Sequence, residues 1–167
     1  MTTVASLRAT VAQSMRLKTD REVIEGALAL IEADGGWTQG TYCRDAAGIE
    51  VKPAVESPGE WVRVRTEHVG GGGYVVRTET GASPCSYCLG GALRAAAGYW
   101  HAAHPAAAHA QVERLENLLL RLANSATAAG WSTLDACNDD PHTTRADAVL
   151  MLKRAEAQLD AKEPMRR

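Results

Sequence analysis

The sequence Trp61-Val62-Arg63-Val64-Arg65-Thr66-Glu67 alternates valine with arginine, as a β-strand does when one face is buried and the other meets solvent. Glycines fill positions 70–73, and Tyr74-Val75-Val76-Arg77-Thr78-Glu79-Thr80 then alternates less cleanly. Together these stretches predict a β-hairpin with a glycine tip. The glycine run is not a phosphate-binding loop, because neither a Lys-Ser/Thr pair nor a helix follows it.

Strands and helices surround this hairpin. Residues 37–44 and 50–55 have strand character on either side of the turn Asp45-Ala46-Ala47-Gly48, which predicts a second hairpin. Helices with one apolar face are predicted over about residues 19–34, 86–98, 106–128 and 145–161. Two of them begin at capping sequences, Thr19-x-x-Glu22 and Thr144-x-x-Asp147. We therefore expect an α+β fold, a small antiparallel sheet of two hairpins with helices packed on one face.

The length and composition suit a soluble globular protein. The chain has 167 residues, 46% of them hydrophobic and 23% charged, which is enough for one cored domain. We expect a separable N-terminal helix over residues 1–17, a single α+β domain over 18–162 and a disordered tail over 163–167. The net charge of −2 argues against nucleic-acid binding. Without a signal peptide or an apolar run of roughly 20 residues, we expect a cytoplasmic protein that does not bind membranes.

Cys85-x-x-Cys88 at the predicted start of a helix is the strongest chemical signal in the chain. Unpaired N–H groups at a helix start stabilise a thiolate, so the pair is a candidate dithiol or zinc site. Zinc would need Cys43, Cys137 or a histidine as further ligands, and His101-x-x-His104 is the nearest second pair. A thioredoxin-like enzyme would need a βαβ setting that is missing. The structural alternative is that Cys88 is a small buried apolar residue, with no cofactor bound.

A cysteine nucleophile is a third possible use of these residues. His142 would serve as the base for Cys88 or Cys85, and Asn138 or Asp139 would orient it. The sequence gives no reason for these residues to meet. The segment 138–144 also has a structural explanation, because Asn and Asp favour turns and Thr144 caps the last helix.

Two groups of residues are candidates for contact with a protein partner. Tyr99 and Trp100 form an aromatic pair at the end of a predicted helix, and aromatic residues dominate interface hot spots. Arg63, Arg65 and Arg77 are predicted to share one exposed face of the hairpin. The structural alternatives are a buried junction for the aromatic residues and a solvated sheet face for the arginines.

Three blocks of sequence carry a resemblance to a known family. They contain Trp37-Thr38-Gln39-Gly40, then Tyr87-Cys88 with Gly91-Ala92-Leu93, and finally Asn138-Asp139 with Thr144 and Asp147. Together they resemble domain-of-unknown-function family 6197 of actinobacteria and their bacteriophages. The resemblance implies a small cytosolic domain without an established activity. It marks as structural motif residues Trp37, Gln39, Gly40, Cys88, Gly91, Asn138, Asp139 and Thr144, whereas Cys43, Cys137 and His142 depart from the family pattern.

Three functional hypotheses follow. The first is a non-catalytic interaction or regulatory protein, encoded by a phage or prophage, whose sheet edge or aromatic junctions bind a host protein or a second copy. The second is a thiol- or zinc-dependent protein centred on Cys85 and Cys88. The third is a homodimer in which the helix over 111–128 packs on itself. The absence of a complete catalytic constellation favours the first.

Overall fold

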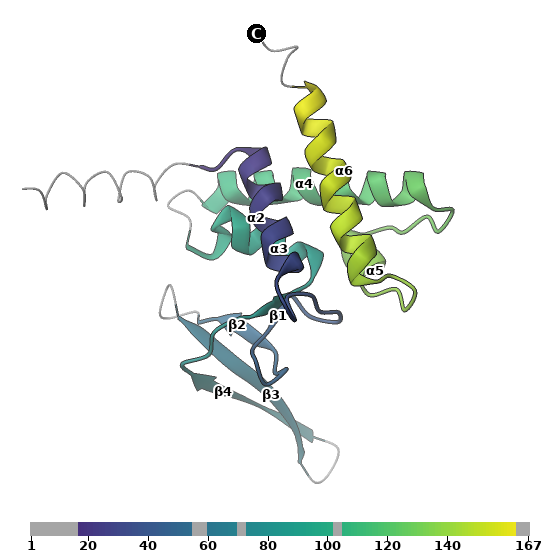
Figure 1. Ribbon diagram of the computed structural model, residues 1–167. Helices are drawn as coiled ribbons and strands as arrows, with labels where there is room; N and C mark the ends of the chain where they lie inside the picture. Colours follow the sequence, from purple (N-terminus) through teal and green to yellow (C-terminus); the bar gives the residue numbers. More distant parts are fainter. Residues whose placement is uncertain (1–16, 55–59, 70–72, 102–104, 163–167) are drawn as a thin grey trace, which may run out of the picture.

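The computed structural model describes residues 17–54, 60–69, 73–101 and 105–162 (Figure 1). The expected helix over 1–17 falls outside them except for Leu17, and so do the expected tail over 163–167, most of the glycine tip and His104. The helices are α2 (Asp20–Glu32), α3 (Leu89–Ala97), α4 (Pro105–Ala126), α5 (Leu134–Asn138) and α6 (Arg145–Lys162), with a 3₁₀ turn η1 (Tyr99–His101). The strands are β1 (Cys43–Arg44), β2 (Val51–Pro53), β3 (Trp61–Val69), β4 (Gly73–Thr80) and β5 (Ser86–Tyr87).

Helices α2, α3, α4, α5 and α6 pack against one another and form what we call the helical body. Helix α2 lies between α3 and α6, and α4 crosses behind them (Figure 1). Gly26 allows α2 to approach α3 closely, because a Cβ there would lie 3.1 Å from the Cβ of Ala96. The largest side chains that are completely buried include Ile24, Ile31, Leu89, Leu93, Leu115, Leu119 and Leu152. The hydrophobic core therefore lies mainly between helices.

Both predicted helix caps are confirmed. Thr19 and Glu22 form a reciprocal capping box at the start of α2, with each side chain accepting a hydrogen bond from the other residue's backbone N–H. At the start of α6, the Asp147 carboxylate accepts from the N–H and the hydroxyl of Thr144. Such caps satisfy backbone donors that lack partners within the helix, and they fix where the helix begins.

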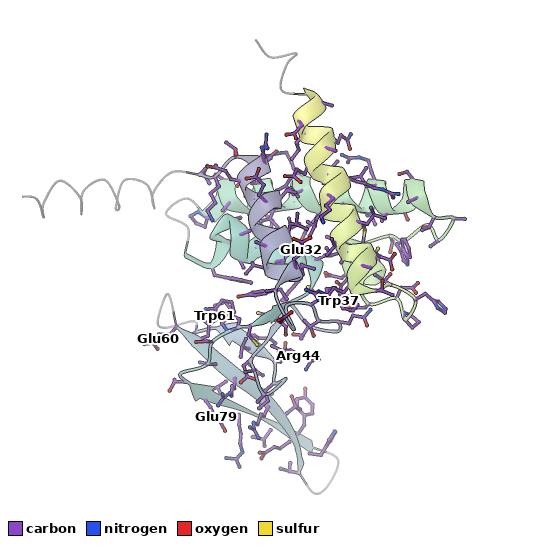
Figure 2. All side chains as sticks on the ribbon, in the orientation of Figure 1. Glu32, Trp37, Arg44, Glu60, Trp61 and Glu79 are labelled. Carbon is purple, nitrogen blue, oxygen red and sulfur yellow. The ribbon has the colours of Figure 1, made fainter. Side chains whose placement is uncertain are left out.

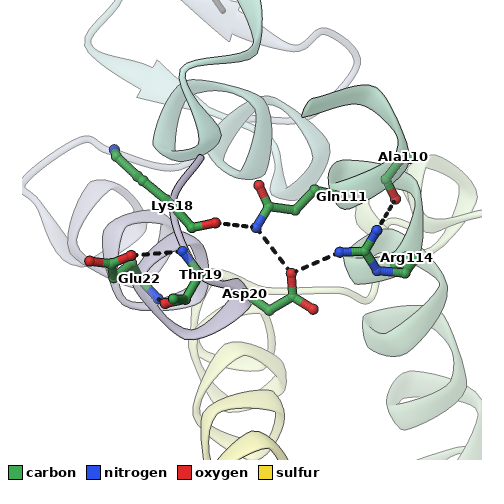
Figure 3. Close-up of polar contacts among 7 residues, drawn as sticks. All are labelled: Lys18, Thr19, Asp20, Glu22, Ala110, Gln111 and Arg114. Atoms are coloured by element: carbon green, nitrogen blue, oxygen red, sulfur yellow. Dashed lines mark hydrogen bonds and ion pairs between the residues drawn. The ribbon is translucent and has the colours of Figure 1, made fainter. Parts of the chain in front are cut away.

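A polar network fastens the start of α2 to α4 (Figure 3). The side-chain amide of Gln111 donates to the carbonyl of Lys18 at 2.6 Å and to the carboxylate of Asp20 at 3.0 Å. Arg114, one helical turn later, donates to the same Asp20 oxygen at 3.1 Å. Gln111 is buried, so these bonds replace hydration that its side-chain NH₂ group has lost.

The strands form two antiparallel sheets within the described residues. One pairs β1 with β5, and the other has the order β2-β3-β4. The predicted hairpin of β3 and β4 is confirmed, with Arg65 directly opposite Arg77. The predicted pairing across the 45–48 turn is reduced to one bridge between Arg44 and Glu50, because β1 and β2 join different sheets. The α+β class with antiparallel strands is therefore confirmed.

The β3–β4 hairpin projects away from the helical body (Figure 1). It meets the helices at the end that carries Trp61 (Figure 2). There the Trp61 ring packs edge-on against Trp100, with centroids 4.7 Å apart. The side chains of residues 74–80 are all exposed. The helices thus cover less of this sheet than expected, because they bury their apolar faces against one another.

The start of α3 differs from the prediction. Ser86 and Tyr87 form strand β5 instead of the first helical turn, and α3 begins at Leu89 with Cys88 as its N-cap. Hydrogen bonds to the backbone of the 36–44 segment stabilise an extended conformation here. The N–H of Tyr87 donates to the Gly36 carbonyl, and the N–H of Cys88 donates to the Tyr42 carbonyl. The short helix α5 and the turn η1 were not predicted. No helix in the described ranges is long and apolar enough to cross a bilayer.

Candidate functional site

The two cysteines of Cys85-x-x-Cys88 lie in different environments. Cys85 is exposed, whereas Cys88 is only 4% exposed and accepts a hydrogen bond on Sγ from the N–H of Gly91 at 3.2 Å. Desolvation by burial raises the Cys88 pKa to about 12, although the N–H groups at the helix start act in the opposite direction. Burial therefore favours a protonated thiol at Cys88 over the thiolate considered from the sequence.

The other two cysteines are also buried thiols. Burial raises the pKa of Cys43 to about 12 and that of Cys137 to about 11. Among the described residues, no group of three or more Cys, His, Asp or Glu side chains is arranged to hold a metal ion. The zinc hypothesis therefore gains no ligand set from this part of the chain.

Asn138 is the centre of a hydrogen-bond junction that joins the three sequence blocks. It is completely buried, and its Oδ1 accepts from the indole N–H of Trp37 at 3.2 Å and from the backbone N–H of Leu89 at 3.1 Å. Its Nδ2 donates to the Thr38 carbonyl and to the Asp139 carboxylate. The Asn138 side chain thus accepts from a backbone N–H in the first turn of α3 and also binds the loop that follows α2.

Gln39 and Gly40 bind the segment that follows Asn138. The Gln39 amide donates to the carbonyls of Asn138 at 2.6 Å and Asp140 at 3.1 Å, and the Gly40 N–H donates to the Asp139 carboxylate at 2.8 Å. Gly91 lies beside this junction, where a Cβ would come within 2.0 Å of the Tyr42 carbonyl oxygen. These contacts give the motif residues a structural use.

Two hollows flank the junction. The two residues of the hypothetical cysteine–histidine pair, Cys88 and His142, line different ones. Cys88 lines a hollow of about 300 Å³ together with Tyr42, Glu50, Asp135 and Asp139. His142 lines a different hollow of about 450 Å³, between the end of α4 and α6. The structure therefore does not bring Cys88 and His142 together.

A charged cluster that was not predicted lies beside the first hollow. Arg94 on α3 forms an ion pair with Glu116 on α4 at 2.6 Å, and its guanidinium lies 4.4 Å from the centroid of the Tyr42 ring. Burial raises the pKa of Glu116, which the positive charge of Arg94 opposes. The sequence offered no signal for this cluster, because its members come from separate elements.

The predicted arginine group is divided by the structure. Arg63 and Asp45 form an ion pair at the base of the sheet, where the Asp45 carboxylate is buried and its pKa lies below its ordinary value. Arg77 pairs with Glu67 at 2.7 Å in solvent. Arg65 and Arg77 are direct neighbours across the hairpin and carry like charges. Only these two therefore present positive charge on the exposed part of the hairpin.

The predicted aromatic pair is half-buried. Trp100 contacts Trp61, and Tyr99 packs edge-on against Trp100 and lies beside His109 on α4. These contacts fasten the hairpin to the helical body, which matches the structural alternative considered for this pair.

The outer side of β4, which we call the β4 edge, is an apolar surface. A sheet edge was among the possible binding surfaces expected from the sequence, but its residues were not named. Strand β4 ends the sheet and has no strand beyond it in the described ranges. Tyr74 is 69% exposed, Val76 is 53% exposed, and Val75 and Val69 lie nearby in solvent. The imperfect alternation of Tyr74-Val75-Val76 was the available signal, because consecutive apolar residues place apolar side chains on both faces of a strand.

Comparison with known proteins agrees with the sequence blocks. No curated protein and no solved structure is significantly similar to this chain. One family model matches residues 15–158, a span that includes the Asn138 junction, the hairpin, helices α2 to α5 and most of α6. The chain belongs to the family of unknown function DUF6197.

Proposed function

We propose that this protein is a non-catalytic interaction module and that the β4 edge is its binding surface. The observation that carries the proposal is the exposure of Tyr74 and Val76 on an edge strand that no other helix or strand of the described residues covers. Exposed, apolar edge strands tend to pair with other chains, and proteins usually protect them with charges, prolines or covering segments. In the described residues, the charged side chains on this strand are Arg77 and Glu79, both in its second half.

The edge is suited to the addition of a strand from a partner. Its backbone supplies hydrogen-bonding groups, and its alternating side chains supply selectivity. Helices near the Trp61 end hold the base of the hairpin, while the rest extends outward where a partner has access (Figure 1). A rigid base with an open edge favours binding without a large rearrangement of the body.

We also place this activity in the cytoplasm of a bacterium or a phage-infected cell, with a regulatory role and a phage or prophage origin. The net charge of −2 gives no electrostatic basis for binding nucleic acid. The thiol-dependent alternative has less support, because the Cys88 thiol is buried and its pKa is about 12.

Site-specific photo-crosslinking in the producing cells tests the proposal. A benzophenone amino acid at position 74 is expected to give discrete covalent adducts, which mass spectrometry identifies. The matched control places the same group at Glu113, an exposed position on α4. Adducts at position 74 that disappear with Val76→Lys support the β4 edge as the binding surface. Equal adducts at both positions, or none at position 74, contradict it.

A further inference from the structure

We propose that the partner of the β4 edge is a second copy of this chain, paired antiparallel to the first with a two-fold axis at Val76. The inference rests on the proposed function, since it names the partner of the same surface. It joins the three-stranded sheets of two copies into one continuous sheet. The backbone groups, the charges and the exposed apolar residues of β4 each restrict the choice of partner and register.

The first step identifies the backbone groups that face the open edge. Val64 donates its N–H to Glu50 on the β2 side, so the even residues of β3 point their backbone groups toward β2. Because these groups alternate along a strand, the odd residues of β3 bond to β4. Their partners in β4 are also odd, as in the pairing of Arg65 with Arg77. The groups that face the open edge are therefore those of Tyr74, Val76, Thr78 and Thr80.

The second step concerns register. Two antiparallel copies of β4 can exchange hydrogen bonds only if even residues pair with even residues. Within residues 73–80, the two such registers of greatest overlap place the two-fold axis at Val76, pairing 73–79 with itself, or at Arg77, pairing 74–80 with itself. An axis at Arg77 sets two guanidinium groups directly opposite each other, which is destabilising. Charge therefore selects the axis at Val76.

The third step concerns side chains. With the axis at Val76, the two copies of Val76 face each other and each Tyr74 lies opposite Thr78 on the same face. On the other face, Val75 lies opposite Arg77, whose aliphatic stem can cover it. The exposed apolar residues of β4, Tyr74, Val75 and Val76, thus all enter the shared part of the sheet.

The arrangement also leaves room for the helices. The helical body lies at the Thr80 end of β4, and the free end of the hairpin points away from it (Figure 1). In an antiparallel pair the two bodies therefore lie at opposite ends of the joined sheet. A pairing through α4 would instead need an exposed apolar face, but the apolar residues of α4 face the core.

Sedimentation velocity over a range of concentrations tests whether the chain pairs through this edge. We expect a monomer–dimer equilibrium that Val76→Lys weakens by at least about tenfold, because it sets two ammonium groups opposite each other. Leu150→Lys is the matched control, since Leu150 is an exposed apolar residue on α6. It is expected to leave the equilibrium unchanged, and thermal melts establish that both variants fold.

Disulfide trapping tests the register. In a Cys85→Ser background, which removes the exposed thiol, Val76→Cys is expected to give a disulfide-linked dimer on mild oxidation. Thr78→Cys is expected to give none, because the two copies of residue 78 would be four residues apart along the strands, about 13 Å. That separation exceeds the Cα distance of a disulfide.

The outcomes separate this inference from the proposed function. Trapping at position 76 with a dimer sensitive to Val76→Lys supports the inference. A monomer at every concentration overturns the self-pairing, whereas photo-adducts of position 74 with a different protein would still support the binding role of the edge. Trapping at position 78 in preference to position 76, or equal weakening by Leu150→Lys and Val76→Lys, also overturns the proposed pairing.

Discussion

The helical body and the β3–β4 hairpin place their apolar residues in opposite environments. The body buries Leu93, Leu119 and Leu152 completely, whereas the hairpin leaves Tyr74 and Val76 more than half exposed. Burial of apolar area is the main source of folding free energy. The body therefore supplies most of the stability, and the outer half of the hairpin contributes little to it. Apolar residues that do not stabilise the fold are candidates for binding.

The polar interactions of the two regions differ in the same way. In the body, Asn138 makes hydrogen bonds that connect residues about a hundred positions apart in the sequence. In the hairpin, Arg77 pairs with Glu67 across two neighbouring strands in solvent. A buried polar group is costly to leave unpaired, but an exposed ion pair has little effect on stability. Substitutions should therefore distinguish the two regions clearly.

The largest effect is expected from Leu119→Ala at the centre of α4. This change removes buried methyl groups and leaves a cavity, so we expect the free energy of unfolding to fall by about 2–5 kcal/mol. Val76→Ala in the hairpin should change it by less than about 0.5 kcal/mol. Urea unfolding measures both, at a concentration low enough to keep the protein monomeric. Similar losses for the two variants would contradict the division between body and hairpin.

A loss of about 3 kcal/mol is expected from Asn138→Ala. The substitution leaves the Trp37 indole N–H and the Leu89 backbone N–H without their acceptor, and each buried donor costs about 1–3 kcal/mol. Asn117→Ala is the control, because Asn117 is exposed on α4 and donates to the Glu113 carbonyl of its own helix. Equal stability of the two variants in urea would mean that the Asn138 junction does not hold the loops together.

A smaller loss, about 1–3 kcal/mol, is expected from Cys88→Ala, which leaves a small cavity and removes the cap of α3. Cys85→Ala should have almost no effect, since Cys85 is exposed. A thiol reagent offers an independent measurement: it should modify Cys85 quickly and Cys88 only when the protein unfolds, because the Cys88 pKa is about 12. Rapid modification of Cys88 in the folded protein would contradict the burial of its thiol.

The same contrast explains which features could be predicted from the sequence. The caps at Thr19 and Thr144 depend on residues three positions apart, so local sequence was sufficient to find them. The alternation of Val62 and Val64 with arginines likewise located β3. The caps and the β3 strand are each determined by residues only a few positions apart in the sequence.

The features that were missed depend on tertiary contacts. Ser86 and Tyr87 have no local reason to leave the helical conformation, but the 36–44 segment offers them strand partners. In the same way, nothing near Arg63 in the sequence indicates that it binds Asp45 while Arg77 stays in solvent. For Cys88, helix position suggested an activated thiol, and burial had the larger and opposite effect on its pKa.

Acid pH offers a test of the point where the hairpin meets the rest of the fold. Ionised Asp45 accepts hydrogen bonds from Arg63 and from the backbone of Ile49 and Ala47, which lowers its pKa in the folded state. Its contribution to stability is therefore present above the pKa of an unfolded Asp, about 3.9, and is lost as the pH falls through the lower folded-state pKa. We expect Asp45→Asn to flatten this acid loss in melts recorded from neutral pH downward. Glu67→Gln, in the exposed pair, is the control that should retain it.

The smallest effect is expected from Arg77→Ala, which removes an exposed ion pair with Glu67 and also relieves the repulsion from Arg65. Because these contributions are small and opposite, the free energy of unfolding should change by less than about 0.5 kcal/mol. Arg63→Ala should destabilise the protein more, since it leaves the buried Asp45 carboxylate without its guanidinium partner. If Arg77→Ala proved the more damaging of the two in urea, the outer hairpin would have to be part of the stable fold rather than a surface kept open for binding.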